Sequence, residues 1–139
     1  MIVLYSSFKG SLRGVNFIII RPDNKILVQK RCPNAHTNPN RYCFPGGAIE
    51  KGEKPLIAVE REAYEETGVF FHKFTYLCDI EYELKGVIYV NRVFLCRVPF
   101  FPYIFSKEGK MFWKTIKEID KIDLALGENV ILPILKEVI

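Results

Sequence analysis

Apolar and polar positions along the chain follow two periods, and the changes of period divide it into strand-like and helix-like segments. The stretch VNFIIIRPDNKILVQKR, residues 15–31, carries two apolar runs of strand length separated by Pro22, Asp23 and Asn24. Such runs around turn-forming residues predict two β-strands joined by a tight turn. The same argument predicts a short strand in RYCFPGG, residues 41–47, which leads into a Gly-Gly turn.

The second half of the chain is mainly strand-like. Residues 69–84 have extended, β-rich character, and a turn at Lys85-Gly86 leads into VIYVNRVFLCRV, residues 87–98. Trp113 is expected on a further strand, after the proline-rich loop PFFPYIF.

Two segments are predicted to be helical. Residues 55–67 form the first, because Pro55 suits a first helical turn and Gly68 follows its end. Residues 127–139 carry apolar residues at helical spacing, and Pro133 is expected to delay or bend this second helix. Strands, helix, strands and helix in this order predict an α/β fold, a sandwich with a mixed β-sheet between helices.

Composition narrows the class of protein. A chain of 139 residues with 49% hydrophobic and 26% charged residues is typical of one globular domain, here residues 1–139. No apolar run approaches the roughly 20 residues of a membrane helix, and no signal peptide precedes the first strand, so a cytoplasmic location is expected. Cys32, Cys43, Cys78 and Cys96 form no C-x-x-C pair, which predicts free thiols rather than a structural zinc site.

Acidic residues are concentrated in the first helical segment, although the chain has a net charge of +4. Glu62, Glu65 and Glu66 fall within an arc of roughly 100° on one helix face, and no Lys or Arg follows any of them at i+4. One interpretation is a solvated acidic face. The glycines that frame the segment favour another, a platform of hard oxygen ligands for Mg²⁺, which usually shares its coordination with substrate phosphates.

The same segment resembles the Nudix box, which here spans residues 47–69. The matching positions are Gly47, Glu53, Arg61, Glu62, Ala63, Glu65, Glu66, Gly68 and Val69. The stretch KRCPNAHTNPNRYCFPGGAIEKGE is also similar to MutT-type nucleoside triphosphate pyrophosphohydrolases of that family. The resemblance implies a Nudix-type α/β/α sandwich over the whole chain.

The resemblance implies roles for residues at matching positions. Glu62, Glu65 and Glu66 would hold the catalytic divalent metal, with help from the Gly47 carbonyl. Glu53 would act as a base or as a supporting carboxylate, and Arg61 would orient it through an ion pair. Glu108 resembles a further catalytic and metal-binding carboxylate on a facing loop, and an ordinary exposed loop glutamate is the alternative.

Four residues are expected to bind substrate: Arg31, Phe44, Gly46 and Asn129. Arg31 matches an arginine that contacts the nucleotide in MutT-type enzymes, and Asn129 lies near the asparagine that reads the purine edge in them. For the ring of Phe44, packing in the core is the alternative.

The implied function is Mg²⁺-dependent hydrolysis, with Mn²⁺ as a possible substitute, of a nucleoside diphosphate linked to another group. An NTP or dNTP, oxidised or not, would give the monophosphate and pyrophosphate. The alternatives are a dinucleoside polyphosphate or ADP-ribose hydrolase, or a nucleotide-sensing module of the same fold. RNA end processing is not expected, because the sequence shows no basic–aromatic stripe for stacked bases. The expected partner is a small nucleotide, for a monomer or homodimer.

Overall fold

The computed structural model describes residues 10–36, 39–106, 110–125 and 127–139, and its strands form one seven-stranded sheet. The strands are β1 (Ser11–Ile20), β2 (Ile26–Lys30), β3 (Tyr42–Cys43), β4 (Gly46–Ala48), β5 (Thr75–Leu84), β6 (Val87–Arg97) and β7 (Lys110–Lys114). They run in the order β3-β2-β1-β6-β5, with β4 paired to β1 and β7 to β2. The pair β1–β6 is parallel and the other strand pairs are antiparallel, so the sheet is mixed, as predicted.

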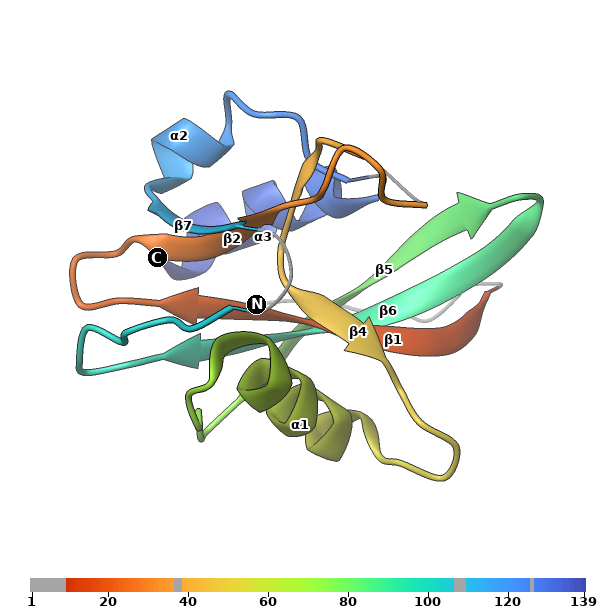
Figure 1. Ribbon diagram of the computed structural model, residues 1–139, viewed down its shortest axis with the longest axis horizontal. Coiled ribbons are helices and arrows are strands. Elements are labelled where there is room, and N and C mark those ends of the chain that lie inside the picture. Colours follow the sequence, from red (N-terminus) through yellow and green to blue (C-terminus); the bar gives the residue numbers. More distant parts are fainter. Residues whose placement is uncertain (1–9, 37–38, 107–109, 126) are drawn as a thin grey trace.

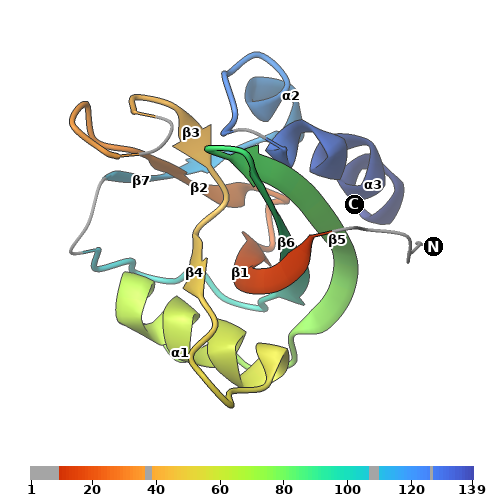
Figure 2. The ribbon, with the colours of Figure 1, turned by 90° about the vertical axis from the view of Figure 1, so that its right-hand side faces the viewer.

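Helices cover the sheet from both sides. They are α1 (Pro55–Thr67), α2 (Ile116–Ile119), the 3-10 helix η1 (Glu128–Val130) and α3 (Ile131–Val138). Figure 1 shows α1 below the sheet and α2 and α3 above it, and the quarter turn of Figure 2 shows the sheet curving between them. The predicted α/β/α sandwich is therefore confirmed.

Strand β1 supplies both hydrophobic cores. Ile18 and Ile20 belong to the cluster that includes Leu135 of α3, whereas Phe17 and Ile19 belong to the cluster that contains part of α1. All residues from position 14 to position 20 are buried, because a central strand covered on both faces has no polar side. This explains why residues 17–20 form a continuous apolar run rather than an alternating one.

The predicted turn after this run is present. The Arg21 N–H donates to the Lys25 carbonyl at 2.9 Å, and Asn24 takes a left-handed conformation with φ of 63°. Asparagine tolerates this conformation better than most residues do. The turn predicted at Lys85-Gly86 also separates two strands, and Trp113 lies on β7.

The single strand predicted in residues 41–47 is two short strands that pair with different partners. Strand β3 pairs with β2, and β4 pairs with β1. Pro45 separates them, since proline has no N–H to donate to a strand ladder, while its carbonyl accepts the Phe17 N–H at 2.8 Å. This change of partner carries the chain from the pocket described below to α1.

Two other segments differ from the sequence prediction. Residues 69–74 are irregular, so the extended segment becomes a strand only at Thr75. The last helical segment begins with η1 after Gly127, and Pro133 occupies the third position of α3. The N–H groups of a first turn have no partner within an α-helix, so proline costs little there.

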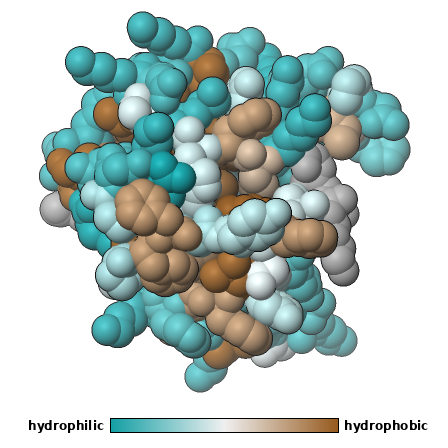
Figure 3. Space-filling view, turned by 60° about the vertical axis from the view of Figure 1, so that its left-hand side comes forward, coloured by the Kyte–Doolittle hydropathy of each residue, from teal (hydrophilic) through white to brown (hydrophobic). Residues whose placement is uncertain are grey.

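Figure 3 shows apolar side chains gathered in a central patch, with polar ones around it, on the face reached by turning the left-hand side of Figure 1 forward. None of the described helices combines the length and apolar character needed to cross a membrane. Cys43, Cys78 and Cys96 are buried free thiols and Cys32 is an exposed one.

Candidate active site

Helix α1 places the acidic residues of the predicted box against strand β4. Ala58, Val59 and Ala63 are buried in the core, and the left-handed Gly68, with φ of 75°, ends the helix by donating to the Tyr64 carbonyl. Anchored in this way, α1 holds Glu62 and Glu66 half-buried, while Glu65 is exposed.

Arg61 lies at the centre of an acidic cluster. Its guanidinium donates to both oxygens of Glu53, at 2.8 and 2.9 Å, to Glu62 at 3.1 Å and to Glu65 at 3.0 Å. A fifth bond, of 2.9 Å, goes to the Ala48 carbonyl on β4. These five hydrogen bonds match the five N–H donors that an arginine side chain possesses.

The pairing with Arg61 corrects one expectation. The sequence argument looked for a cation four residues after each glutamate, whereas Arg61 precedes Glu65 by four positions and Glu62 by one. Arg61 therefore relieves part of the repulsion. It offsets only one of the four carboxylate charges of Glu53, Glu62, Glu65 and Glu66, so the cluster keeps a net negative charge.

Glu53 is held in its ionised form. Its two hydrogen bonds from Arg61, together with the Glu50 N–H at 3.0 Å, lower the pKa of Glu53 to about 2. The same bonds raise the pKa of Arg61. Because a general base works best with a pKa near the working pH, this carboxylate suits the orienting role better than that of a base. The ion pair between Arg61 and Glu53 that the sequence predicted is present.

Gly47 brings β4 into direct contact with the cluster. A Cβ at this position would lie 2.0 Å from Oε2 of Glu62, so a larger residue here would have to displace that carboxylate. Gly47 therefore lets strand β4 approach the carboxylate closely.

The side chains predicted to bind the metal are not already arranged around one point. Among the residues that the structure describes, no three histidine, cysteine or carboxylate side chains are grouped so that they could hold a metal ion. Glu62 and Glu65 are bonded to Arg61 instead. The hard oxygen donors and the net negative charge nevertheless fit a cation such as Mg²⁺. Glu108 lies outside the described residues.

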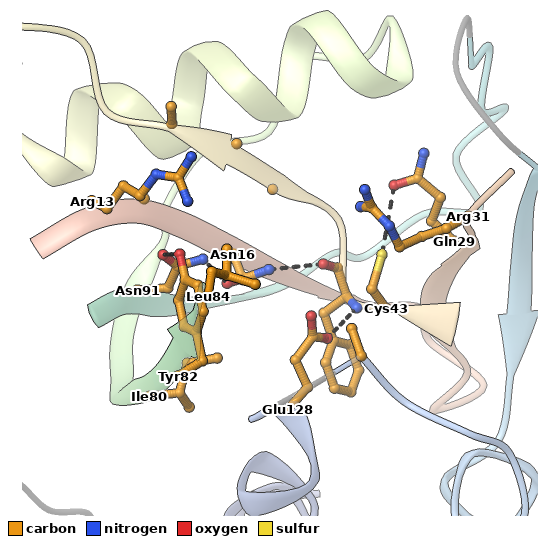
Figure 4. Close-up of a pocket in the computed structure, with 16 residues that line it drawn as sticks. Arg13, Asn16, Gln29, Arg31, Cys43, Ile80, Tyr82, Leu84, Asn91 and Glu128 are labelled. Carbon is orange, nitrogen blue, oxygen red and sulfur yellow. Dashed lines mark hydrogen bonds between the residues drawn. The ribbon is translucent and has the colours of Figure 1, made fainter. Parts of the chain in front are cut away.

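A cavity of about 230 Å³ opens beside Gly47 (Figure 4). Of the predicted substrate-binding residues, Arg31, Phe44 and Gly46 line it. The ring of Phe44 belongs to the hydrophobic core, so its backbone is the part that serves the cavity. Further lining residues that the sequence argument did not single out include Arg13, Asn16, Gln29, Tyr82, Asn91 and Glu128.

The structure does not place Asn129 in this cavity. Asn129 is exposed, whereas the preceding residue, Glu128, is buried and lines the cavity. Both belong to η1, in which neighbouring side chains point in different directions. The role of Asn129 in substrate binding stays a prediction, and Glu128 is the residue of η1 that lines the cavity.

A chain of hydrogen bonds connects one wall of the cavity to the other (Figure 4). The Tyr82 hydroxyl donates to Asn91 at 2.9 Å, and the Asn91 amide donates to Asn16 at 2.9 Å. Asn16 donates to the Phe44 carbonyl at 2.9 Å, and the Phe44 N–H donates to Oε1 of Glu128 at 2.7 Å. The peptide groups on both sides of Phe44 are thereby held in place.

Glu128 is the carboxyl group at one end of this chain. It is 7% exposed, and burial raises its pKa to about 8, although the Phe44 N–H and the charge of Arg31 act in the opposite direction. Burial also raises the pKa of Cys43 to about 12, so this thiol is a poor nucleophile. At neutral pH the cavity therefore contains a largely protonated acid beside a cation.

Lysines and aromatic rings from β2, β3 and β7 lie close together. Lys30 and Lys114 lie over the ring of Tyr42, at 5.7 and 5.5 Å from its centre, and Lys114 lies 5.5 Å from that of Phe112. This basic–aromatic cluster is not apparent in the linear sequence, because strand pairing brings its residues together. The expectation against an RNA substrate stays a prediction, because these contacts lie within the protein.

Comparison with known proteins agrees with this geometry. The family model described as "NUDIX domain" matches residues 10–122. An 8-oxo-dGTP diphosphatase of Escherichia coli (strain K12) is 42% identical over 66 residues, which are 48% of this chain and 50% of that protein. An RNA pyrophosphohydrolase of Pelagibacter ubique (strain HTCC1062) is 38% identical over 85 residues, 57% of this chain and 52% of that protein.

These matches span about half the length of the curated relatives. Among solved structures, the E. coli ORF135 protein superimposes with a TM-score of 0.77 at 23% identity, covering 93% of this chain and 91% of that one. At this identity the likeness concerns the fold.

Proposed function

We propose that this chain, which is a member of the Nudix hydrolase family, hydrolyses an NTP or dNTP to the monophosphate and pyrophosphate. Water would add across the inner phosphoanhydride, so that one P–O bond forms and one breaks. The observation that carries the proposal is the position of Gly47. It lines the cavity and touches Glu62 of the acidic cluster, so a nucleotide in the cavity would direct its phosphates at the carboxylates.

The acidic cluster supports a divalent metal as cofactor. Glu62, Glu65, Glu66 and the Gly47 carbonyl would hold Mg²⁺, or Mn²⁺ in its place. When bound, the metal would neutralise phosphate oxygens and lower the pKa of a water molecule. Arg61 fixes the side chains of Glu62 and Glu65, and Glu53 fixes Arg61. Glu108 stays a prediction as a further carboxylate of the site.

The cavity supports the binding of the base and sugar. Arg31 offers a cation, and Glu128 offers a carboxyl group whose position is set by the Phe44 N–H. A neutral acid can both donate and accept a hydrogen bond, whereas its ionised form can only accept. The protonation of Glu128 would therefore affect which base edges the cavity accepts. We propose Glu128, and not Asn129, as the residue that contacts the base.

The test is product analysis over a panel of nucleotides with Mg²⁺, using wild-type protein and Glu66→Gln. The panel contains canonical and oxidised NTPs, dinucleoside polyphosphates, ADP-ribose and a short 5′-triphosphate RNA. Monophosphate and pyrophosphate from an NTP, absent with Glu66→Gln and retained with the exposed-site control Glu83→Gln, would support the proposal. Hydrolysis of ADP-ribose and of no other member of the panel would replace the NTP proposal by an ADP-ribose hydrolase.

A binding measurement separates an enzyme from a nucleotide-sensing module. If Mg²⁺ binds the folded acidic cluster, the Tm should rise with Mg²⁺ concentration in wild type and less in Glu66→Gln. Nucleotide binding without turnover of any member of the panel would favour the sensing module.

A 5′-triphosphate RNA end is a second candidate substrate, for one specific reason. The cluster of Lys30, Lys114, Tyr42 and Phe112 joins cations to aromatic rings, a combination that binds single strands in other proteins. Arg31, which follows Lys30, lines the cavity. Preferential cleavage of the RNA over the matching NTP, lost as salt rises, would favour this candidate.

A further inference from the structure

One residue of strand β1, Arg13, departs from the alternation of its neighbours. The register with β6 shifts between Leu12 and Gly14, which pair with consecutive residues of β6, so Arg13 is an extra residue in β1. Such a β-bulge changes the direction of the side chain that it contains. Regular alternation would place Arg13 beside Val15, in the core that contains part of α1. Arg13 instead lines the cavity together with Asn16.

Contacts on two sides hold Arg13 in this position. Its guanidinium carbon lies 4.5 Å from the centre of the Tyr89 ring, and a guanidinium packs favourably on an aromatic face. The Arg13 carbonyl accepts the N–H of Ile49, the residue after β4, at 2.9 Å. The side chain is exposed, but both its backbone and its charged end are oriented by the protein.

The charge of Arg13 is not neutralised by an ion pair within the described part of the chain. The cations of the ion pairs found there are Arg21, Arg61, Arg92 and Lys136. Burial raises the pKa of the nearby Tyr82 hydroxyl, and Arg13 acts in the opposite direction. Whereas the five donors of Arg61 are used within the protein, Arg13 therefore brings a positive charge to the cavity that an anionic ligand can meet.

Arg13 and the proposed base site lie at different ends of the cavity. Asn16, which bonds to the Phe44 carbonyl, is three residues, or about 10 Å, from Arg13 along β1. Gly47 pairs with β1 between these two positions. Figure 4 shows Arg13 at one end of the cavity and Arg31 at the other. With the base beside Phe44, the end of the cavity beyond Gly47 is left for phosphates.

We propose that Arg13 is a specificity-determining residue that binds the outer phosphates of the nucleotide, which leave as pyrophosphate. This inference rests on the proposed function, from which it takes the base site and the position of the inner phosphate beside Gly47. A guanidinium can bind a phosphate through two parallel N–H···O bonds. Its charge also offsets the negative charge that the leaving pyrophosphate gains as the P–O bond breaks. Arg13 thus favours a triphosphate over a monophosphate with the same base.

An outer phosphate fits Arg13 better than a nucleotide base does. Tyr89 covers one face of the guanidinium, whereas the N–H donors point outward in its plane, where phosphate oxygens can accept them. A base stacked on the remaining face would lie at the opposite end of the cavity from Arg31. It would then be drawn away from the backbone of Phe44 and from Glu128, the groups that can read its edge.

The test measures binding without turnover, by titration calorimetry with Mg²⁺ present. The ligands are the α,β-methylene analogues of ATP and GTP, with AMP and GMP for comparison. Arg13→Gln should weaken binding of the preferred triphosphate analogue at least about tenfold, the scale of lost hydrogen bonds to a charged group. Binding of the matching monophosphate should be unchanged. Arg13→Lys keeps the charge without the planar fork and should lose less.

A matched control removes the same charge elsewhere. Arg97 is an exposed arginine at the end of β6, and Arg97→Gln should leave the binding of triphosphate and monophosphate unchanged.

Three results would overturn the inference. Wild type could bind the triphosphate analogues no more tightly than the monophosphates. Arg13→Gln could bind the triphosphate analogues as wild type does. Arg13→Gln could also weaken the binding of triphosphate and monophosphate by the same factor, which would place Arg13 beside the base or the sugar. Failure of the proposed function is a different result, in which binding depends on Arg13 but wild type hydrolyses no member of the nucleotide panel.

Discussion

The acidic cluster on α1 and the cavity beside Gly47 differ in how their polar groups are connected along the chain. Arg61 reaches partners one, four, eight and thirteen positions away. Of the four bonds in the chain that crosses the cavity, three join residues separated by 28, 75 and 84 positions, and the fourth joins residues nine positions apart. One region is encoded locally and the other depends on the completed sheet.

The two regions also treat charge differently. In the cluster, ionised groups are paired by hydrogen bonds near the surface, and the pKa of Glu53 falls to about 2. In the cavity, burial raises the pKa of Glu128 to about 8. The same type of side chain is thus stabilised as an anion in one region and as a neutral acid in the other, 75 residues later. Three substitutions would break or sharpen this contrast.

The largest effect is expected from Gly47→Ala, at the contact between the two regions. The new methyl group would have to displace the Glu62 carboxylate, which lies 2.0 Å from its position. A shift on the order of 1 Å can cost about 100-fold in rate, so kcat/KM should fall by about that factor while the circular dichroism spectrum is retained. Gly86→Asn is the control, since that site is open and left-handed. Unchanged kcat/KM in Gly47→Ala would show that Glu62 does not act at this point.

A smaller effect is expected from Arg61→Lys, which tests the cluster alone. Lysine has three donors and no planar fork, so it cannot replace the five bonds of Arg61. Activity should fall about 10- to 100-fold, as for other residues that orient metal ligands. The Tm should also fall, and Mg²⁺ should raise the Tm of Arg61→Lys by more than it raises the Tm of wild type. Equal responses to Mg²⁺ in the two proteins would contradict the idea that Arg61 and the metal share the same carboxylates.

The smallest effect is expected from Glu128→Gln, measured as the pH dependence of stability. The pKa of this group is about 8 in the folded protein against an ordinary value of 4.5. The folded state therefore keeps a proton that the unfolded state loses, so the contribution of Glu128 is most favourable below pH 4.5 and is lost as pH rises to 8. The free energy of unfolding, measured with urea, should decline less between pH 5 and 8 in Glu128→Gln than in wild type. An identical decline would mean that Glu128 is ionised in the folded protein.

The same contrast explains what could be predicted from the sequence. The helix at 55–67 and its acidic face were predictable because both follow from spacing within one segment, whereas the Arg61–Glu53 ion pair was implied by the resemblance to the Nudix box. The roles of Glu62, Glu65 and Glu66 in metal binding stay a prediction. Glu128 was missed because its partner, the Phe44 N–H, lies 84 positions away and no local pattern connects them. The stacking of Tyr64 on Phe70 was missed for a similar reason, since the two rings meet only after the turn at Gly68.

Strand β1 has a consequence for the synthesis of the protein. It pairs in parallel along most of its length with β6, whose last residue, Arg97, is made long after Ile20. At about 5–20 residues per second, a ribosome needs on the order of 4 to 15 s to make the intervening segment. During this time the apolar run of β1 lacks its longest partner, and unpaired apolar strands are prone to aggregate. The strand that supplies both cores is thus also the part of the nascent chain that most needs protection.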